Sequence, residues 1–242
     1  KKILKIFLFF FVFCNSVYAE LKIDITSGYT EPTPIGLSQF TGTNDKEKLL
    51  AKEISDLVSA DLERSGLFKV IDPKAYIQKI SNINVKPRFS DWRVISAQAL
   101  IVGFTKINDD GNIRVEFRLW DTFAEQQMAG WAFNTLRSNW RQISHRIADK
   151  IYERLTGEIG YFDTRIAYVA ESGPSKKRIK RLAIMDQDGA NHRFLTNGVN
   201  LVLTPRFSPS QQELTYLSYI GRIPRVYLLH IETGKQEIVG DF

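Results

Sequence analysis

The chain has 242 residues, of which 43% are hydrophobic and 25% are charged, and its formal net charge is +6. These values fit a globular protein of one or two domains. A single cysteine, Cys14, excludes a disulfide within the chain and a metal site built from several cysteines.

The first nineteen residues have the pattern of a secretory signal peptide. Three lysines precede an apolar run, "IFLFFFVF", that is too short to span a bilayer, and Val17-Tyr18-Ala19 offers a cleavage site after Ala19. Phe13, directly before the cysteine, argues against a lipoprotein anchor. Without these residues, 30 basic residues (33 less 3 lysines) face 27 acidic ones. The remaining net charge of +3 argues against a nucleic-acid partner, and we expect an exported protein.

The segment that follows predicts strands interleaved with helices. Residues 21–25, "LKIDI", alternate between apolar and polar side chains, as in a half-exposed strand. Apolar residues at helical spacing, after a capping Asn44 or Asp45, predict a helix that Gly66 ends. We also expect strands at residues 35–40 and 67–71, and a helix from Asp72-Pro73 to about residue 80.

Residues 90–157 predict a short helix, three strands and a long helix. The short helix is expected at residues 90–97, the strands at 99–107, 113–121 and 127–135, and the long helix at 139–155, before Gly157. "NDDG" between the first two strands is a hairpin signal, because Asp-Gly tolerates positive φ. The interleaved order predicts an α/β or α+β domain of ordinary size.

Beyond residue 160 the sequence shows strands and turns without a helical pattern. Two segments, residues 165–196 and 213–239, look alike. Their matched positions, with offsets of 44 to 48 residues, are Tyr168 with Tyr216, Arg181 with Arg225 and Gly189 with Gly234. A period near 45 with several short strands in each unit indicates β-propeller blades, and a chance pair of hairpins is the alternative.

Several motifs together resemble the TolB family of the Tol–Pal system. They are "ELKIDITSG" after the signal, the "PIGL" that follows, "LAIMDQDGANHRFLT", and "FSPSQQELTYLSY", which is similar to the family's recurring blade motif. The resemblance covers the whole chain. It implies a periplasmic protein in which an α/β domain precedes a six-bladed propeller. Here the chain reaches Phe242 after about two blades, which suggests either a fragment or a truncated gene product.

The expected organisation has four parts: a signal peptide (1–19), a mobile partner-binding segment (20–31), an α/β domain (32–157) and incomplete propeller blades (160–242). By themselves, the residues after the signal fit either a first core strand or a detachable handle that adds to a partner's sheet edge. The resemblance favours the handle and implies that it binds the C-terminal domain of the inner-membrane protein TolA. The site residues are then Glu20, Leu21, Lys22, Ile23, Asp24, Ile25, Thr26, Ser27 and Gly28.

The resemblance also implies that the propeller binds the lipoprotein Pal, although most of that site lies outside this sequence. We expect a monomer that reaches membranes only through its partners and that needs no cofactor. The alternatives are a fragment of a propeller-containing serine peptidase and a polysaccharide-binding protein. The sequence has no G-x-S-x-G, P-loop, G-x-G-x-x-G or H-E-x-x-H motif, so we expect no enzymatic activity.

The remaining charged and aromatic residues are expected to have structural roles rather than to form a binding or catalytic site. The basic run at residues 176–181 is expected to form a solvated hairpin turn, and the Asp-Asp pair at 109–110 and the two aspartates at 186 and 188 are expected at turns. No two of the three histidines have metal-ligand spacing, and we expect all three at the surface or at an interface. The four tryptophans are expected in the core of the first domain.

Overall fold

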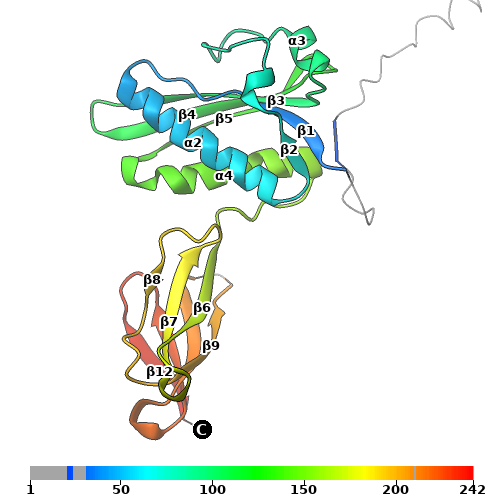
Figure 1. The fold of residues 1–242 in the computed structure, drawn as a ribbon. Helices are drawn as coiled ribbons and strands as arrows, with labels where there is room; N and C mark the ends of the chain where they lie inside the picture. Colours follow the sequence, from blue (N-terminus) through cyan, green and yellow to red (C-terminus); the bar gives the residue numbers. More distant parts are fainter. Residues whose placement is uncertain (1–20, 24–30, 210, 242) are drawn as a thin grey trace, which may run out of the picture. The chain divides into compact units, whose positions relative to one another are not determined.

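The computed structural model describes residues 21–23, 31–209 and 211–241. The chain divides into two compact units, the first ending at Gly160 and the second beginning at Tyr161. Each unit has its own sheets (Figure 1). Each also has its own buried side chains. Among the described residues, no helix combines the length and the apolar character needed to cross a bilayer.

The first unit is built on a five-stranded mixed sheet with the strand order β2-β1-β3-β4-β5. β1 (Thr33–Leu37) is parallel to β2 (Phe68–Val70) and to β3 (Ala99–Ile107). β3, β4 (Asn112–Asp121) and β5 (Gln126–Leu136) form an antiparallel meander. The three strands predicted for the meander are confirmed to within one residue at each end, and so is the Asp-Gly turn, whose glycine has φ 80°.

Two long helices, α2 (Asp45–Arg64) and α4 (Trp140–Thr156), lie side by side on one face of this sheet (Figure 1). Asn44 begins α2 with a capping box: its side chain accepts from the N–H of Glu47, whose carboxylate accepts from the N–H of Asn44. α4 ends at Gly157, which has the left-handed φ of 82°. Both predicted helices are confirmed. The core-facing stripe of α4 consists of residues four positions apart, Ile143, Ile147, Ile151 and Leu155.

The opposite face of the sheet is partly covered by α3 (Phe89–Val94), which confirms the predicted short helix but ends three residues before the expected position. Trp92 of α3 packs against β1 at Gly36, where a Cβ atom would come within 2.7 Å of the indole ring. On the helix-covered face, Phe40 lies in the same way against Gly103 of β3, where a Cβ atom would collide with its ring. Both aromatic side chains are almost fully buried, so each glycine leaves room for a ring that packs on the sheet.

The helix predicted from Asp72 to about residue 80 is wrong, because the structure has only a single 3₁₀ turn, Pro73–Ala75. Tyr76 follows this turn with an extended backbone. Its hydroxyl donates to the carbonyl of Ile71, at 2.8 Å, and accepts from the N–H of Leu37, at 3.0 Å. Hydrogen bonds to β1 and to the end of the neighbouring strand thus override the local helix signal.

The second unit contains two antiparallel sheets. One has the order β6-β7-β8, with β6 (Arg165–Ser172), β7 (Ile179–Asp186) and β8 (Arg193–Phe194). The other has consecutive strands β9 (Val202–Phe207), β10 (Glu213–Ser218), β11 (Arg225–His230) and β12 (Gln236–Asp241). Buried side chains from β7, β9, β10 and β11 form one hydrophobic core. Meandering sheets that pack against each other in this way are the arrangement of propeller blades.

The predicted repeat corresponds to equivalent positions in the two sheets. Tyr168 and Tyr216 lie in β6 and β10, and Arg181 and Arg225 lie in β7 and β11. The matched glycines, with φ 87° and 69°, follow β7 and β11 in the turns that connect each of them to the next strand. The fold is therefore a mixed α/β unit followed by a partial propeller, as predicted.

Candidate functional site

Three residues of the predicted partner-binding segment, Leu21, Lys22 and Ile23, lie at the C-terminal end of α4. The N–H of Ile23 donates to the carbonyl of Leu155 at 2.8 Å, and the Ile23 side chain is buried. This carbonyl belongs to the last turn of α4, where carbonyl groups have no partner within the helix. Leu21 is half-buried and Lys22 is exposed, so apolar side chains alternate with a polar one, although these residues form no regular strand.

The remaining six predicted site residues lie outside the described residues. They are Glu20, Asp24, Ile25, Thr26, Ser27 and Gly28. The structure therefore places only one third of the predicted site, and that third is docked on the chain's own first unit.

A hollow of about 420 Å³ lies beside this docked segment. Its lining has one aromatic ring, from Trp131 of β5, together with three cationic side chains and one carboxylate; the lining residues are Lys22, Trp131, Lys150, Glu153, Arg154 and Gly157. Lys150 pairs with Glu153 at 2.7 Å, and Nε of Arg154 donates to the carbonyl of Met128 at 3.1 Å. The predominance of cations suits an acidic group better than a basic one.

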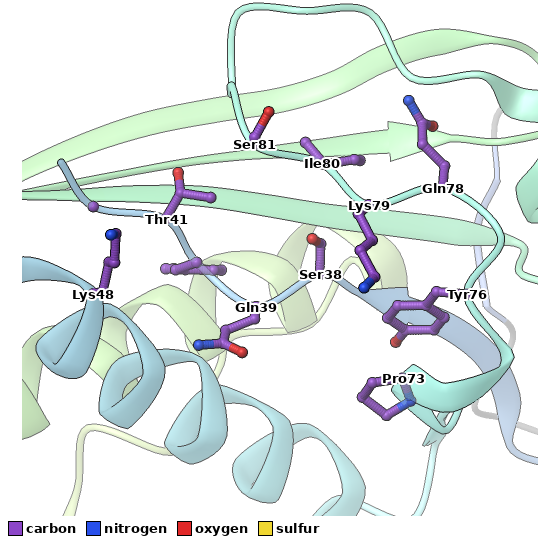
Figure 2. A pocket seen from close by; sticks show the side chains of 12 residues that line it. Ser38, Gln39, Thr41, Lys48, Pro73, Tyr76, Gln78, Lys79, Ile80 and Ser81 are labelled. Carbon is purple, nitrogen blue, oxygen red and sulfur yellow. The ribbon is translucent and has the colours of Figure 1, made fainter. Parts of the chain in front are cut away.

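A larger hollow of about 520 Å³ opens beside the start of α2 (Figure 2). The strand predicted at residues 35–40 in fact ends at Leu37. Residues 38–41 continue as a strap along β3, and the N–H of Thr41 donates a hydrogen bond to the carbonyl of Gly103. This strap forms one wall, and residues 73–81 form the other. In Figure 2, Lys79 extends toward the part of the hollow that Ser38 and Tyr76 line.

The side chains of this larger hollow suit binding rather than acid–base chemistry. Burial raises the pKa of Tyr76, and its hydroxyl is already hydrogen-bonded to backbone groups. The Gln78 carbonyl accepts from the N–H of Arg88 and from Nε1 of Trp92. The lining contains two lysines, Lys48 and Lys79, but no histidine, cysteine or carboxylate.

His145, expected at the surface or at an interface, lies where the two long helices meet. Only 2% of it is accessible, and its Nδ1 lies 2.6 Å from a carboxylate oxygen of Asp61, which is fully buried in α2. The other carboxylate oxygen of Asp61 accepts from Arg64 at 2.8 Å. This buried pair joins the two long helices. The sequence offers no local signal for it, because the partners are 84 positions apart.

The other histidines lie in the second unit, where His192 is exposed and His230 half-buried. Within each unit taken separately, the described residues contain no group of three His, Cys, Asp or Glu side chains close enough to share a metal ion. Asp109 and Asp110 lie at the turn between β3 and β4, and Asp188 lies between β7 and β8, as predicted, whereas Asp186 is the last residue of β7.

The basic run at 176–181 is only partly a turn. Lys176 and Lys177 belong to the 3₁₀ turn Ser175–Lys177, but the last three residues of the run belong to β7. Within β7, Lys180 pairs with Glu171 at 2.8 Å, and the guanidinium of Arg181 lies over the ring of Phe194. Two cations of the run are thus engaged with neighbouring strands of the same sheet.

The tryptophans divide into two groups. Trp92 and Trp120 are buried in the first unit, as predicted. Trp140 is half-buried, and Trp131 is 36% exposed, with its ring stacked on that of Phe117 at 5.5 Å. The prediction is therefore wrong for Trp131, which presents an aromatic surface at the smaller hollow.

The fold defines a two-unit protein in which a mixed α/β unit precedes blades of a β-propeller. Residues 21–128 match the family of the TolB amino-terminal domain, and residues 152–242 match that of the TolB beta propeller domain. The Tol-Pal system protein TolB of Paramagnetospirillum magneticum is 55% identical over 224 residues, which are 93% of this chain and 50% of that protein.

A solved structure shows the same architecture. The crystal structure of TolB from Acinetobacter baumannii superposes with a TM-score of 0.75 at 27% identity, covering 88% of this chain and 50% of that one. The chain belongs to the TolB family. It spans half the length of these two relatives.

Proposed function

We propose that this chain is part of a non-enzymatic periplasmic adaptor of the Tol–Pal system. The adaptor links TolA of the inner membrane to the lipoprotein Pal of the outer membrane and thereby supports envelope integrity and constriction at division. Membership in the TolB family and the similarity to a Tol-Pal system protein support the proposal. In this proposal residues 1–19 are a cleaved signal peptide, and residues 20–31 are the handle for TolA.

The observation that carries the proposal is the contact of Ile23 with the end of α4. Burying one isoleucine side chain contributes about 1.5–3 kcal/mol, and one backbone hydrogen bond contributes about 0.5–1.5 kcal/mol. Fixing the backbone of the three described residues 21–23 costs about 3–6 kcal/mol in conformational entropy. The two sums nearly cancel, so these three residues by themselves dock only marginally. A marginally docked segment can leave the first unit at little cost in free energy and bind a partner instead.

The hypothesised mechanism is a switch between a docked and a released handle. A partner that binds one of these states better shifts the balance toward it, whereas equal affinity for both shifts nothing. We propose that Pal, bound at the propeller, biases the handle in this way. The coupling is reciprocal, so a TolA domain that captures the released handle must change the affinity for Pal by the same factor.

The first test is a calorimetric titration of a peptide of residues 20–31 into the C-terminal domain of the cognate TolA. A matched peptide carries Leu21→Asn, Ile23→Asn and Ile25→Asn, which remove the apolar face but keep the length and charge. We expect binding by the first peptide only. If neither binds, the segment is not a handle, and any TolA contact must lie elsewhere in the protein.

A second comparison measures the docked population. When the handle is docked for part of the time, the whole chain binds TolA more weakly than the free peptide by the released fraction. Because docking is marginal, we expect the peptide to bind about twofold more tightly than the intact chain, and a chain that lacks residues 20–31 not to bind. Equal affinities of peptide and intact chain would show that docking does not compete with TolA.

A further inference from the structure

In the part of the chain that the structure describes, the outer edge of β5 has no strand partner. β5 pairs only with β4, and no other described strand lies on its second side. From Ala129 to Leu136 it pairs residue for residue with β4, after a bulge opposite Leu119 and Trp120. In such an edge, alternate residues point their N–H and C=O groups away from the sheet. Every residue of β5 is exposed or half-exposed.

This edge lacks the features that usually prevent strand pairing. Its sequence, "QQMAGWAFNTL", contains no charged residue and no proline over eleven positions. Natural sheets protect their edges with lysines, prolines, covering elements or very short strands. The other edge of the same sheet follows that rule, because β2 has only three residues. The bulge interrupts β5 near its start only, and leaves eight regular positions.

A row of cations on α4 runs beside this edge. Arg146, Lys150 and Arg154 are spaced four positions apart, so they lie on one face of the helix. The guanidinium of Arg146 lies 5.5 Å from the centre of the Phe133 ring, and Nε of Arg154 donates to the carbonyl of Met128. Both ends of the row thus contact β5. Lys150, which pairs with Glu153 at 2.7 Å, lines the hollow that also contains Trp131.

We propose that the β5 edge is a docking site for an extended, acidic segment of a partner protein, which adds to the sheet as a sixth strand. Its backbone pairs with β5, and its acidic side chains at alternate positions face the cationic row on α4. The intervening side chains lie on the opposite face of the sheet. The proposal does not depend on the TolA handle, since residues 20–31 are not part of β5.

The charges argue against a second copy of this chain as the occupant. Two β5 strands that pair in antiparallel fashion about a two-fold axis keep both α4 helices on the same face of the joined sheet. The two cationic rows would then meet across the seam. Like charges placed opposite each other destabilise such a pairing.

The test uses the whole chain and a synthetic peptide of four Glu-Val repeats, with binding followed by calorimetry at low salt. A control peptide of the same sequence carries an N-methyl group on every residue, which keeps its charge but blocks strand pairing at both of its edges. The protein variant is Arg146→Glu, and the matched control is Lys46→Glu, which makes the same charge change at an exposed position of α2. Each variant is first checked for an unchanged unfolding midpoint.

We expect the unmodified peptide to bind and the N-methylated one not to. Arg146→Glu should weaken binding about fivefold, the effect of one close charge pair at a protein surface, and Lys46→Glu should leave it unchanged. Equal binding of both peptides would overturn the proposal, because attraction would then be purely electrostatic. It is also overturned if hydrogen exchange shows the outward amides of 129–136 already protected in the free chain, or if the chain is a dimer joined through β5.

Discussion

Replacing Glu47 by glutamine removes one charge from the point where α2 meets β3. One carboxylate oxygen of Glu47 accepts from the N–H groups of Thr43, at 2.8 Å, and Asn44, at 3.2 Å. The other accepts from the N–H of Ile107, at 2.9 Å, in the last position of β3. The residue is only 3% exposed, so water cannot replace these partners. A single side chain therefore fastens the first turn of the helix to the sheet.

The expected loss follows from the three hydrogen bonds. A hydrogen bond to a charged group contributes about 1.5–3 kcal/mol, compared with about 0.5–1.5 kcal/mol for a neutral one, so three of them lose about 3 kcal/mol. Glutamine also places its own N–H₂ group against at least one backbone donor. For a unit of this size, about 3 kcal/mol corresponds to a decrease of about 6–12 °C in the unfolding midpoint.

Tryptophan fluorescence is the suitable assay, because all four tryptophans of the chain belong to the first unit. It follows the unfolding of that unit without a contribution from the propeller blades. Glu53→Gln is the matched control, since Glu53 is exposed on the same helix and should change the midpoint by less than about 1 °C. A Glu47→Gln midpoint as high as that of the control would refute the argument from the three hydrogen bonds.

The pH dependence gives an independent check. Burial alone would raise the pKa of Glu47, but the hydrogen bonds from the N–H groups of Ile107, Thr43 and Asn44 outweigh it, and the pKa lies below its ordinary 4.5. A carboxylate with a lowered pKa stabilises the fold above the ordinary value and loses this contribution as the pH falls through the lowered one. The stability gap between the natural protein and Glu47→Gln should therefore be constant near neutral pH and close in acid.

Two further changes test contacts within each unit. Asp61→Asn removes the charge from the buried pair with His145 and should destabilise the first unit by about 2–3 kcal/mol in denaturant unfolding followed by tryptophan fluorescence; a change below about 0.5 kcal/mol would contradict this. Glu232→Gln weakens the ion pairs with Arg165 and Arg193, which join the two sheets of the second unit. Because Glu232 is exposed, hydrogen exchange in β6 and β8 should rise less than about fivefold, and global unfolding of the blades would contradict the assignment.

The regular elements were predictable because their signals are local. The meander, the two long helices and the end of α4 at Gly157 follow from alternation, helical spacing and a glycine at the helix end. The capping box was also within reach, since Glu47 stands three positions after Asn44. The hydrogen bond from the N–H of Ile107 to the same carboxylate could not be predicted in this way, because its partners are 60 positions apart.

The candidate site was harder to predict from the sequence, because it depends on contacts between residues that are far apart along the chain. The burial of His145 depends on Asp61 of another helix, and the turn at Pro73 stops because the Tyr76 hydroxyl finds partners at β1. The alternation of residues 21–25 favours an exposed strand equally well in a core and in a handle. It could not show that Ile23 binds the last turn of α4. These outcomes are decided by long-range contacts, which a local pattern does not contain.

The two rings that press on glycines also determine how the strands are aligned. Gly36 is aligned with Leu100, and Gly103 lies three positions further along β3, so the two glycines open toward opposite faces of the sheet. If β1 slipped by a single residue, a bulky side chain would replace Gly36 beneath the ring of Trp92. The indole and the Phe40 ring thus contact opposite faces of the sheet and favour a single register of β1 against β3. No tight turn joins these parallel strands, so the register depends on such packing.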